Sequence, residues 1–139
     1  MNSLVINLKD KHLSFTTAGH PPFIIFNKNE VKIYQERSSF ISNLIPTSWG
    51  SRTVDLSPGD KILVFTDGIF EIMTTEGKLL GLSHIENFIR KKSHLPSHII
   101  IEELIQDIKM ASKKEKFTDD ISICIFEQKE AAKAVYQNN

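Results

Sequence analysis

Alternating apolar and polar residues run through the first half of the chain, and this period-two pattern is typical of β-strands with one buried face. The predicted strands are Ser3–Leu8, His12–Thr17, Phe23–Phe26, Val31–Tyr34 and Thr53–Leu56. Short runs of turn-forming residues join the first strand to the second and the third to the fourth. The pattern therefore predicts two hairpins followed by a short single strand.

Two further strands are predicted. Lys61–Thr66 contains four large apolar residues in a row, and this continuous run indicates a strand that is buried on both faces. Ile121–Phe126 is one more predicted strand near the end of the chain. Pro58 and Gly59 predict a tight turn just before Lys61, since proline fixes one backbone dihedral and glycine permits another.

Between these two strands the apolar spacing becomes helical. Ser83 and Glu86 form a capping-box pattern, which predicts the start of one helix near Ser83. A second helix is predicted over Ser97–Ser112, just after a proline. Its apolar positions, which follow the helical period, are Ile100, Ile101, Leu104, Ile105 and Ile108. Strands, then two helices, then a final strand indicate an α+β fold.

Composition narrows the class of protein. The 139 residues suffice for one compact domain, and 40% hydrophobic and 24% charged residues are ordinary values for a globular chain. Lysine plus arginine and aspartate plus glutamate both number 17, so no basic excess points to nucleic acid or a membrane surface. No apolar run could insert in a bilayer, and the single Cys124 is expected to be a small buried residue. These features fit a cytoplasmic protein.

Acidic residues stand next to the two most apolar strands. Asp67 follows the first of these strands directly and precedes Gly68, and Asp119 and Asp120 come just before the second. If the two strands are antiparallel neighbours, the three carboxylates converge at one edge of the sheet. Converging carboxylates repel, and a hard cation such as Mg²⁺ or Mn²⁺ would relieve that repulsion. The sequence has no histidine or cysteine cluster with zinc-ligand spacing.

The same residues also fit a simpler interpretation. An Asp-Gly pair after a strand is a common turn, and paired aspartates before a strand are often solvated loop residues. The spacing alone leaves the metal site and the solvated turn both open. His20, between glycine and two prolines, is expected to be hydrogen-bonded within its turn rather than to bind a ligand.

Four motifs in one order carry a resemblance to a known family. They are AGHPP at 18–22, LSPGDKILVFTDGIFE at 56–71, EGKLLG at 76–81 and TDDIS at 118–122. Together they resemble the bacterial SpoIIE/RsbU-like family of metal-dependent type 2C (PPM) serine/threonine protein phosphatases. The resemblance extends from Ser3 to Phe126, nearly the whole chain.

This resemblance implies a fold and a chemistry. The fold would be a sandwich of two antiparallel sheets flanked by helices, with a binuclear Mn²⁺ or Mg²⁺ centre in the complete domain. Asp67 and Asp119 would be metal ligands, and Asp120 would bind an additional ion or orient a water. A metal-bridging water would attack phosphoserine or phosphothreonine directly.

The resemblance also implies partners. The substrate would be a phosphorylated regulatory protein such as an anti-anti-sigma factor, and a sensor or receiver domain would precede the catalytic domain in the same protein. Residues 1–127 would form the C-terminal portion of the phosphatase domain, and residues 128–139 a C-terminal tail. No nucleic acid partner and no direct membrane insertion are expected.

One part of the family pattern is missing from this sequence. The family's first metal-binding motif, whose aspartate bridges both metals, has no counterpart here, so the chain would be a partial domain that lacks the N-terminal portion. The 139-residue chain alone would then be a weak or inactive phosphatase. Missing strands would leave sheet edges unpaired, which favours a homodimer or an exchange of elements between copies.

Two other functions compete with the phosphatase. A regulatory or protein-interaction module derived from the same fold would keep these motifs without catalysis. A haloacid dehalogenase-type phosphatase also places Asp-Gly after a buried strand. That chemistry needs a nucleophilic aspartate two residues before Asp67, where Phe65 stands, so we reject it.

Overall fold

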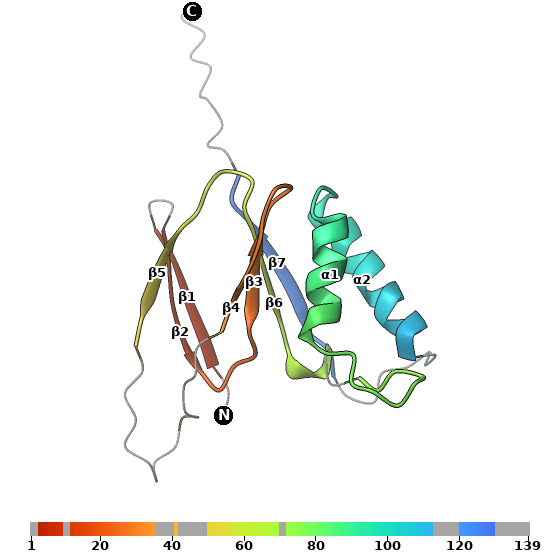
Figure 1. Cartoon of the computed structure of the whole chain (residues 1–139). Coiled ribbons are helices and arrows are strands. Elements are labelled where there is room, and N and C mark those ends of the chain that lie inside the picture. Colours follow the sequence, from red (N-terminus) through yellow and green to blue (C-terminus); the bar gives the residue numbers. More distant parts are fainter. Residues whose placement is uncertain are drawn as a thin grey trace, which may run out of the picture.

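The architecture is two antiparallel sheets and two helices stacked as layers (Figure 1). The computed structural model describes residues 3–9, 12–35, 41, 50–69, 72–112 and 120–129, and for residues 3–9 it describes the backbone alone. In Figure 1 a three-stranded sheet lies on one side of a four-stranded sheet, and α1 and α2 lie on the other. The predicted α+β class, an antiparallel sandwich flanked by helices, is confirmed.

The predicted elements are present with small shifts at their ends. The strands are β1 Ser3–Lys9, β2 His12–Ala18, β3 Phe23–Phe26, β4 Val31–Tyr34, β5 Arg52–Asp55, β6 Lys61–Phe65 and β7 Ile123–Glu127. The helices are the 3₁₀-helix η1 Asp67–Ile69, α1 Leu82–Lys92 and α2 Ser97–Ser112. The strand orders are β1-β2-β5 in one sheet and β4-β3-β6-β7 in the other.

One core fills the space between the two sheets. It contains Leu13 and Phe15 from β2, Phe23 and Ile25 from β3, and Ile62 from β6. Phe15 and Phe23 meet edge to face, with ring centroids 4.7 Å apart, an arrangement that aromatic pairs prefer. The predicted alternation in β2 is confirmed, since every second residue faces this core.

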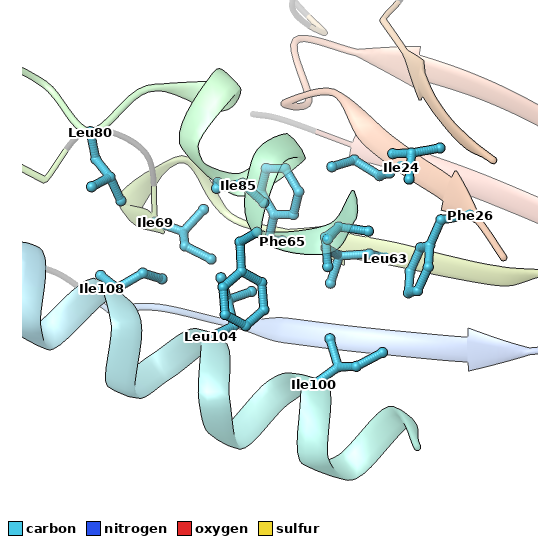
Figure 2. Packing of buried hydrophobic residues seen from close by; sticks show 13 residues of the cluster. Ile24, Phe26, Leu63, Phe65, Ile69, Leu80, Ile85, Ile100, Leu104 and Ile108 are labelled. Atoms are coloured by element: carbon cyan, nitrogen blue, oxygen red, sulfur yellow. The ribbon is translucent and has the colours of Figure 1, made fainter. Parts of the chain in front are cut away.

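A second core fills the space between the four-stranded sheet and the helices. Ile24 of β3, Leu63 and Phe65 of β6, and Ile85 and Leu104 of the helices are all at most 1% exposed. Figure 2 shows these side chains gathered between the strands and both helices. Because β3 and β6 contribute to both cores, they are buried on both faces, as the continuous apolar run predicted for β6.

Ion pairs join the two helices at their rims. His84 of α1 lies 2.5 Å from Asp107 of α2, and Lys92 lies 2.9 Å from Glu103. All four side chains are at least 32% exposed, and exposed pairs of this kind contribute only about 0–1 kcal/mol. The apolar core, rather than these pairs, therefore holds the helices on the sheet.

A buried aspartate fastens the turn that leads into β6. Asp60 is 8% exposed, and its carboxylate accepts hydrogen bonds from the Asn27 side-chain amide at 2.7 Å and the Ser57 backbone N–H at 2.8 Å. Gly59 has φ of 89°, which confirms that glycine is needed in this turn. The turn thereby fixes where β6 begins relative to the β3–β4 hairpin.

Two sequence predictions were wrong. The N-cap of α1 is Gly81, with no side-chain capping bond, so Ser83 lies inside the helix and the capping box is not formed. Cys124 is exposed, although it was expected to be buried. The reason is that β7 is the last strand of its sheet, so the three-stranded sheet does not cover this face of it.

No helix among the described residues is both long enough and apolar enough to span a membrane.

Leu104→Ala is expected to destabilise the fold strongly. The Leu104 side chain is fully buried between α2 and the sheet, so its removal leaves a cavity and should cost about 2–5 kcal/mol of unfolding free energy. Met110→Ala on the same helix is the matched control, because Met110 is 70% exposed and the change should cost less than about 0.5 kcal/mol. Urea unfolding followed by circular dichroism measures both. Equal losses would contradict this assignment of the core.

Candidate metal site

The pairing of β6 with β7 brings two of the predicted acidic residues to one edge of the sheet. The strands are antiparallel, with Phe65 opposite Ile123. Asp67 lies two residues beyond the end of β6, and Asp120 lies three residues before the start of β7. The condition on which the predicted convergence depended, that these strands are antiparallel neighbours, is therefore met.

Thr66 ties the two chain segments together at this edge. Its backbone N–H donates to the Ser122 carbonyl at 3.1 Å. Its hydroxyl accepts from the Ser122 N–H at 3.1 Å and donates to the Asp120 carbonyl at 3.5 Å. These bonds hold the backbone before β7 against the backbone after β6. Sequence reasoning did not single out Thr66, although it stands in the TDG motif beside Asp67.

Gly68 makes the close approach of these segments possible. A Cβ atom built at Gly68 would lie 3.0 Å from the backbone oxygen of Asp120, tighter than nine in ten real Cβ contacts. The backbone segment that Gly68 approaches is that of Asp120. A side chain at position 68 would therefore require the Asp120 backbone to shift by a few tenths of an ångström.

Asp67 stands at the start of η1 with its side chain exposed. Its Oδ1 accepts from the Gly68 N–H at 3.1 Å, which orients the carboxylate locally. Ile69, the last residue of η1, is fully buried and anchors this turn in the helix-side core. The side chain of Asp67 is thus exposed to solvent but carried on an anchored backbone.

Asp120 is also exposed, and it lies three residues before the start of β7. Asp119 lies outside the described residues. Within the described part of the chain, no group of three or more His, Cys, Asp or Glu side chains comes together. The structure therefore brings two of the three predicted ligands to one edge, and their hard oxygen donors suit Mg²⁺ or Mn²⁺ better than zinc.

The AGHPP segment reaches the same edge. Ile24 of β3 lies opposite Leu63 of the antiparallel β6, so the residues before β3 lie beside the residues after β6. His20 contacts the Pro21 carbonyl at 2.8 Å through Nδ1. A carbonyl oxygen only accepts, so Nδ1 must carry the proton. This local bond agrees with the expected structural role for His20.

A comparison with known protein families identifies the family of this chain. The sequence profile of the family described as Stage II sporulation protein E (SpoIIE) matches residues 1–129. The chain belongs to the SpoIIE family. The predicted membership of the SpoIIE/RsbU-like phosphatases is thereby confirmed. A comparison with curated proteins found no match.

Solved structures of phosphatase domains have the same fold as this SpoIIE-family chain. The PP2C domain of SiaA from Pseudomonas aeruginosa matches with a TM-score of 0.74 and 19% identity, over 84% of this chain and 46% of that one. The phosphatase domain of SpoIIE from Bacillus subtilis, presoaked with Mn, matches with a TM-score of 0.71 and 17% identity, over 96% of this chain and 58% of that one.

A more distant phosphatase matches as well. The serine/threonine phosphatase PstP/Ppp of Mycobacterium tuberculosis has a TM-score of 0.63 and 10% identity, over 93% of this chain and 60% of that one. At these identities the likeness establishes the fold. The SpoIIE-family chain spans about half the length of the solved structures it matches.

Gly68→Ala is expected to disturb this edge selectively. The new methyl group would press on the Asp120 backbone oxygen, and overpacking of this kind costs about 1–3 kcal/mol of unfolding free energy. Gly50→Ala is the matched control, since nothing lies within 4 Å of a Cβ at that position. Urea unfolding of both variants measures the difference. A Gly68→Ala variant as stable as Gly50→Ala would refute the close approach described here.

Proposed function

We propose that this chain is the C-terminal part, residues 1–127, of a metal-dependent protein serine/threonine phosphatase domain. The observation that carries the proposal is the β6–β7 register, which brings Asp67 and Asp120 to one edge. Asp67, Asp119 and Asp120 would hold Mn²⁺ or Mg²⁺ there. The side chains of Asp67 and Asp120 are exposed on an anchored edge, so an ion could reach both carboxylates. When bound, such ions lower the pKa of a coordinated water and neutralise charge on phosphoryl oxygens.

The residues of this chain would supply position rather than a nucleophile. Thr66 and Gly68 hold the two acidic segments against each other, so Asp67 and Asp120 can face one ion together. Cys124, the one thiol in the sequence, pairs with Val64 near the Asp67 end of β6. The proposed chemistry needs no covalent phosphoenzyme, because a metal-activated water would attack the phosphorus directly.

The proposed substrate is a phosphoserine or phosphothreonine on a signalling protein of the anti-anti-sigma type. Support comes from the family and from the domains that the matched structures contain. One matched structure contains RsbU and RsbW domains from Mycobacterium tuberculosis, and another contains the PP2C phosphatase domain of Bacillus subtilis SpoIIE with a fragment of its regulatory domain. By the same likeness, we propose that this chain works beside a sensor or receiver domain.

A non-catalytic role of the same fold is the second candidate. The observation that favours it is the small number of ligands, because the described residues bring only two carboxylates to the edge and complete phosphatase sites hold two metals. On this alternative the chain would act through protein contacts alone.

Isothermal titration of the purified chain with Mn²⁺ separates these proposals. We expect one ion to bind, and Asp67→Ala and Asp119→Ala should each weaken binding at least about tenfold, or about 1.4 kcal/mol, because each removes a charged ligand. Asp55→Ala is the matched control, since Asp55 is an exposed aspartate on β5 of the other sheet. It should leave Mn²⁺ binding unchanged.

Circular dichroism on each variant must show that the chain is folded. A folded wild-type chain that binds no Mn²⁺ would reject a metal site formed by these residues and favour the non-catalytic role. Binding that Asp55→Ala reduces as much as Asp67→Ala does would mean that the ion is attracted by general surface charge.

A further inference from the structure

A groove lies at the end of the molecule opposite the candidate metal site. It is lined by the β3–β4 turn, the turn before β6, the α1–α2 turn and the end of β7, and Figure 1 shows these segments together at one end of the sheets. Lys61, the first residue of β6, lines the groove, whereas Asp67 follows the other end of that strand. The groove has a volume of about 590 Å³, within the roughly 300–1,000 Å³ of small-molecule sites.

Ser93 carries the observation that points to a ligand. This residue directly after α1 lines the groove and is only 6% exposed, yet its hydroxyl has no hydrogen-bond partner among the described residues. Every side-chain nitrogen or oxygen in them that is completely buried does have a partner. The Ser93 hydroxyl must therefore reach the surface of the groove. A nearly buried hydroxyl is costly unless it is hydrogen-bonded, so a ligand atom in the groove would stabilise it.

Lys61 is the second buried donor of the groove. It is 7% exposed, and its Nζ donates to the Leu95 carbonyl at 2.6 Å and lies 5.9 Å from the centre of the Phe26 ring. In the part of the chain that the structure describes, no carboxylate forms an ion pair with it. An ammonium group can donate three hydrogen bonds, and a buried charge is ordinarily paired. An anion in the groove would supply both the acceptors and the opposite charge.

The rim of the groove adds two basic side chains and one acidic side chain. Lys28 of the β3–β4 turn and His94 of the α1–α2 turn are both exposed there. Glu127 lies opposite Lys61 in the register of β6 with β7, and its carboxylate accepts from the Ser97 hydroxyl at 2.8 Å. An anion would therefore bind away from Glu127, and a hydroxyl group of the same ligand could donate to that carboxylate.

The groove is distinct from the unpaired edges of the sheets. Additional strands pair sideways along such edges, in the direction of the ladder hydrogen bonds, whereas the groove lies beyond the ends of the strands. Bonds within this chain hold its walls together. The Gly59 N–H donates to the Gln128 carbonyl at 2.8 Å, and Lys61 joins β6 to the α1–α2 turn through Leu95. The chain thus forms the groove by itself.

We propose that this groove binds a small phosphate ester, with its phosphate on the Lys61 ammonium and the Ser93 hydroxyl. A phosphate offers several acceptor oxygens, so it can accept from both donors at once, and its double charge suits two lysines better than a carboxylate would. Six residues of β6 and its end separate the groove from Asp67, which corresponds to roughly 20 Å. The ligand would therefore act as an effector, and the proposal does not depend on the proposed phosphatase function.

Titration of the metal-free chain with glycerol 3-phosphate tests binding. Two-dimensional NMR of the backbone amides should show shifts concentrated at Lys28, Lys61 and residues 93–95, with the amides around Asp67 unchanged. We expect a dissociation constant on the order of 1 mM. Glycerate, which has a single negative charge, should bind at least about threefold more weakly.

Ser93→Ala separates ligand binding from stability. It should weaken glycerol 3-phosphate binding about fivefold to tenfold, because it removes a hydrogen bond to a charged oxygen. The thermal midpoint should stay the same, since that hydroxyl has no partner within the described parts of the chain. Ser112→Ala is the matched control. Ser112 is 7% exposed and bonded to the Lys109 carbonyl at the far end of α2, so its removal should leave binding unchanged.

Charge variants of the rim should act in opposite directions. Lys28→Gln should weaken binding about threefold, whereas Glu127→Gln should strengthen it about twofold, because it removes a like charge and keeps an acceptor for Ser97. Lys78→Gln is the matched control. Lys78 is 79% exposed and pairs with Glu76 outside the groove, so the variant removes the same charge and should leave binding unchanged.

Three results would overturn the proposal. The first is a folded chain whose amides do not shift with glycerol 3-phosphate. The second is equal weakening by Lys28→Gln and Lys78→Gln, which would indicate attraction by general surface charge. The third is sedimentation of the chain with phosphatidate vesicles without binding of glycerol 3-phosphate, which would assign the groove to a lipid headgroup. All titrations are made without metal, so a failure of the Mn²⁺ site would leave these results unaffected.

Discussion

The pairing of β6 with its two neighbours is the constraint on which the rest of the structure depends. This strand supplies Ile62 to the core between the sheets and Leu63 and Phe65 to the core beneath the helices. It therefore joins the three layers. If its register with β7 slipped by one residue, the side chains that now face one core would face the other. The turn held by Asp60 sets where the strand starts. The position of Asp67 at its other end follows from both.

The sequence predicted the strands and the second helix well wherever a strong local signal marks the element. Ser97–Ser112 was predicted with the bounds it has, because Pro96 marks its start and its apolar positions keep one helical period to the end. Thr53–Leu56 was predicted one residue late, since no proline or glycine marks its first residue and Leu56 is buried just beyond the strand. Element ends that a proline or a clear period marks were predicted at the right residue, and ends without such a signal shift by one or two residues.

The two errors have a common physical cause, which is that local patterns do not report tertiary surroundings. Ser83 and Glu86 have capping-box spacing, but the backbone at Gly81, with φ of 77°, starts α1 one residue earlier. Cys124 lies in a run as apolar as β6, and the sequence alone does not tell a central strand from an edge strand. Only the strand order shows that one face of β7 has no sheet opposite it.

The candidate site could be predicted in part for a related reason. The acidic residues were recognised because they stand beside apolar strands, but their convergence required the antiparallel pairing that no local pattern contains. Thr66 and Gly68 act through contacts with residues more than 50 positions away, so their roles became visible only in three dimensions. Asp119, adjacent in sequence to Asp120, remains a prediction.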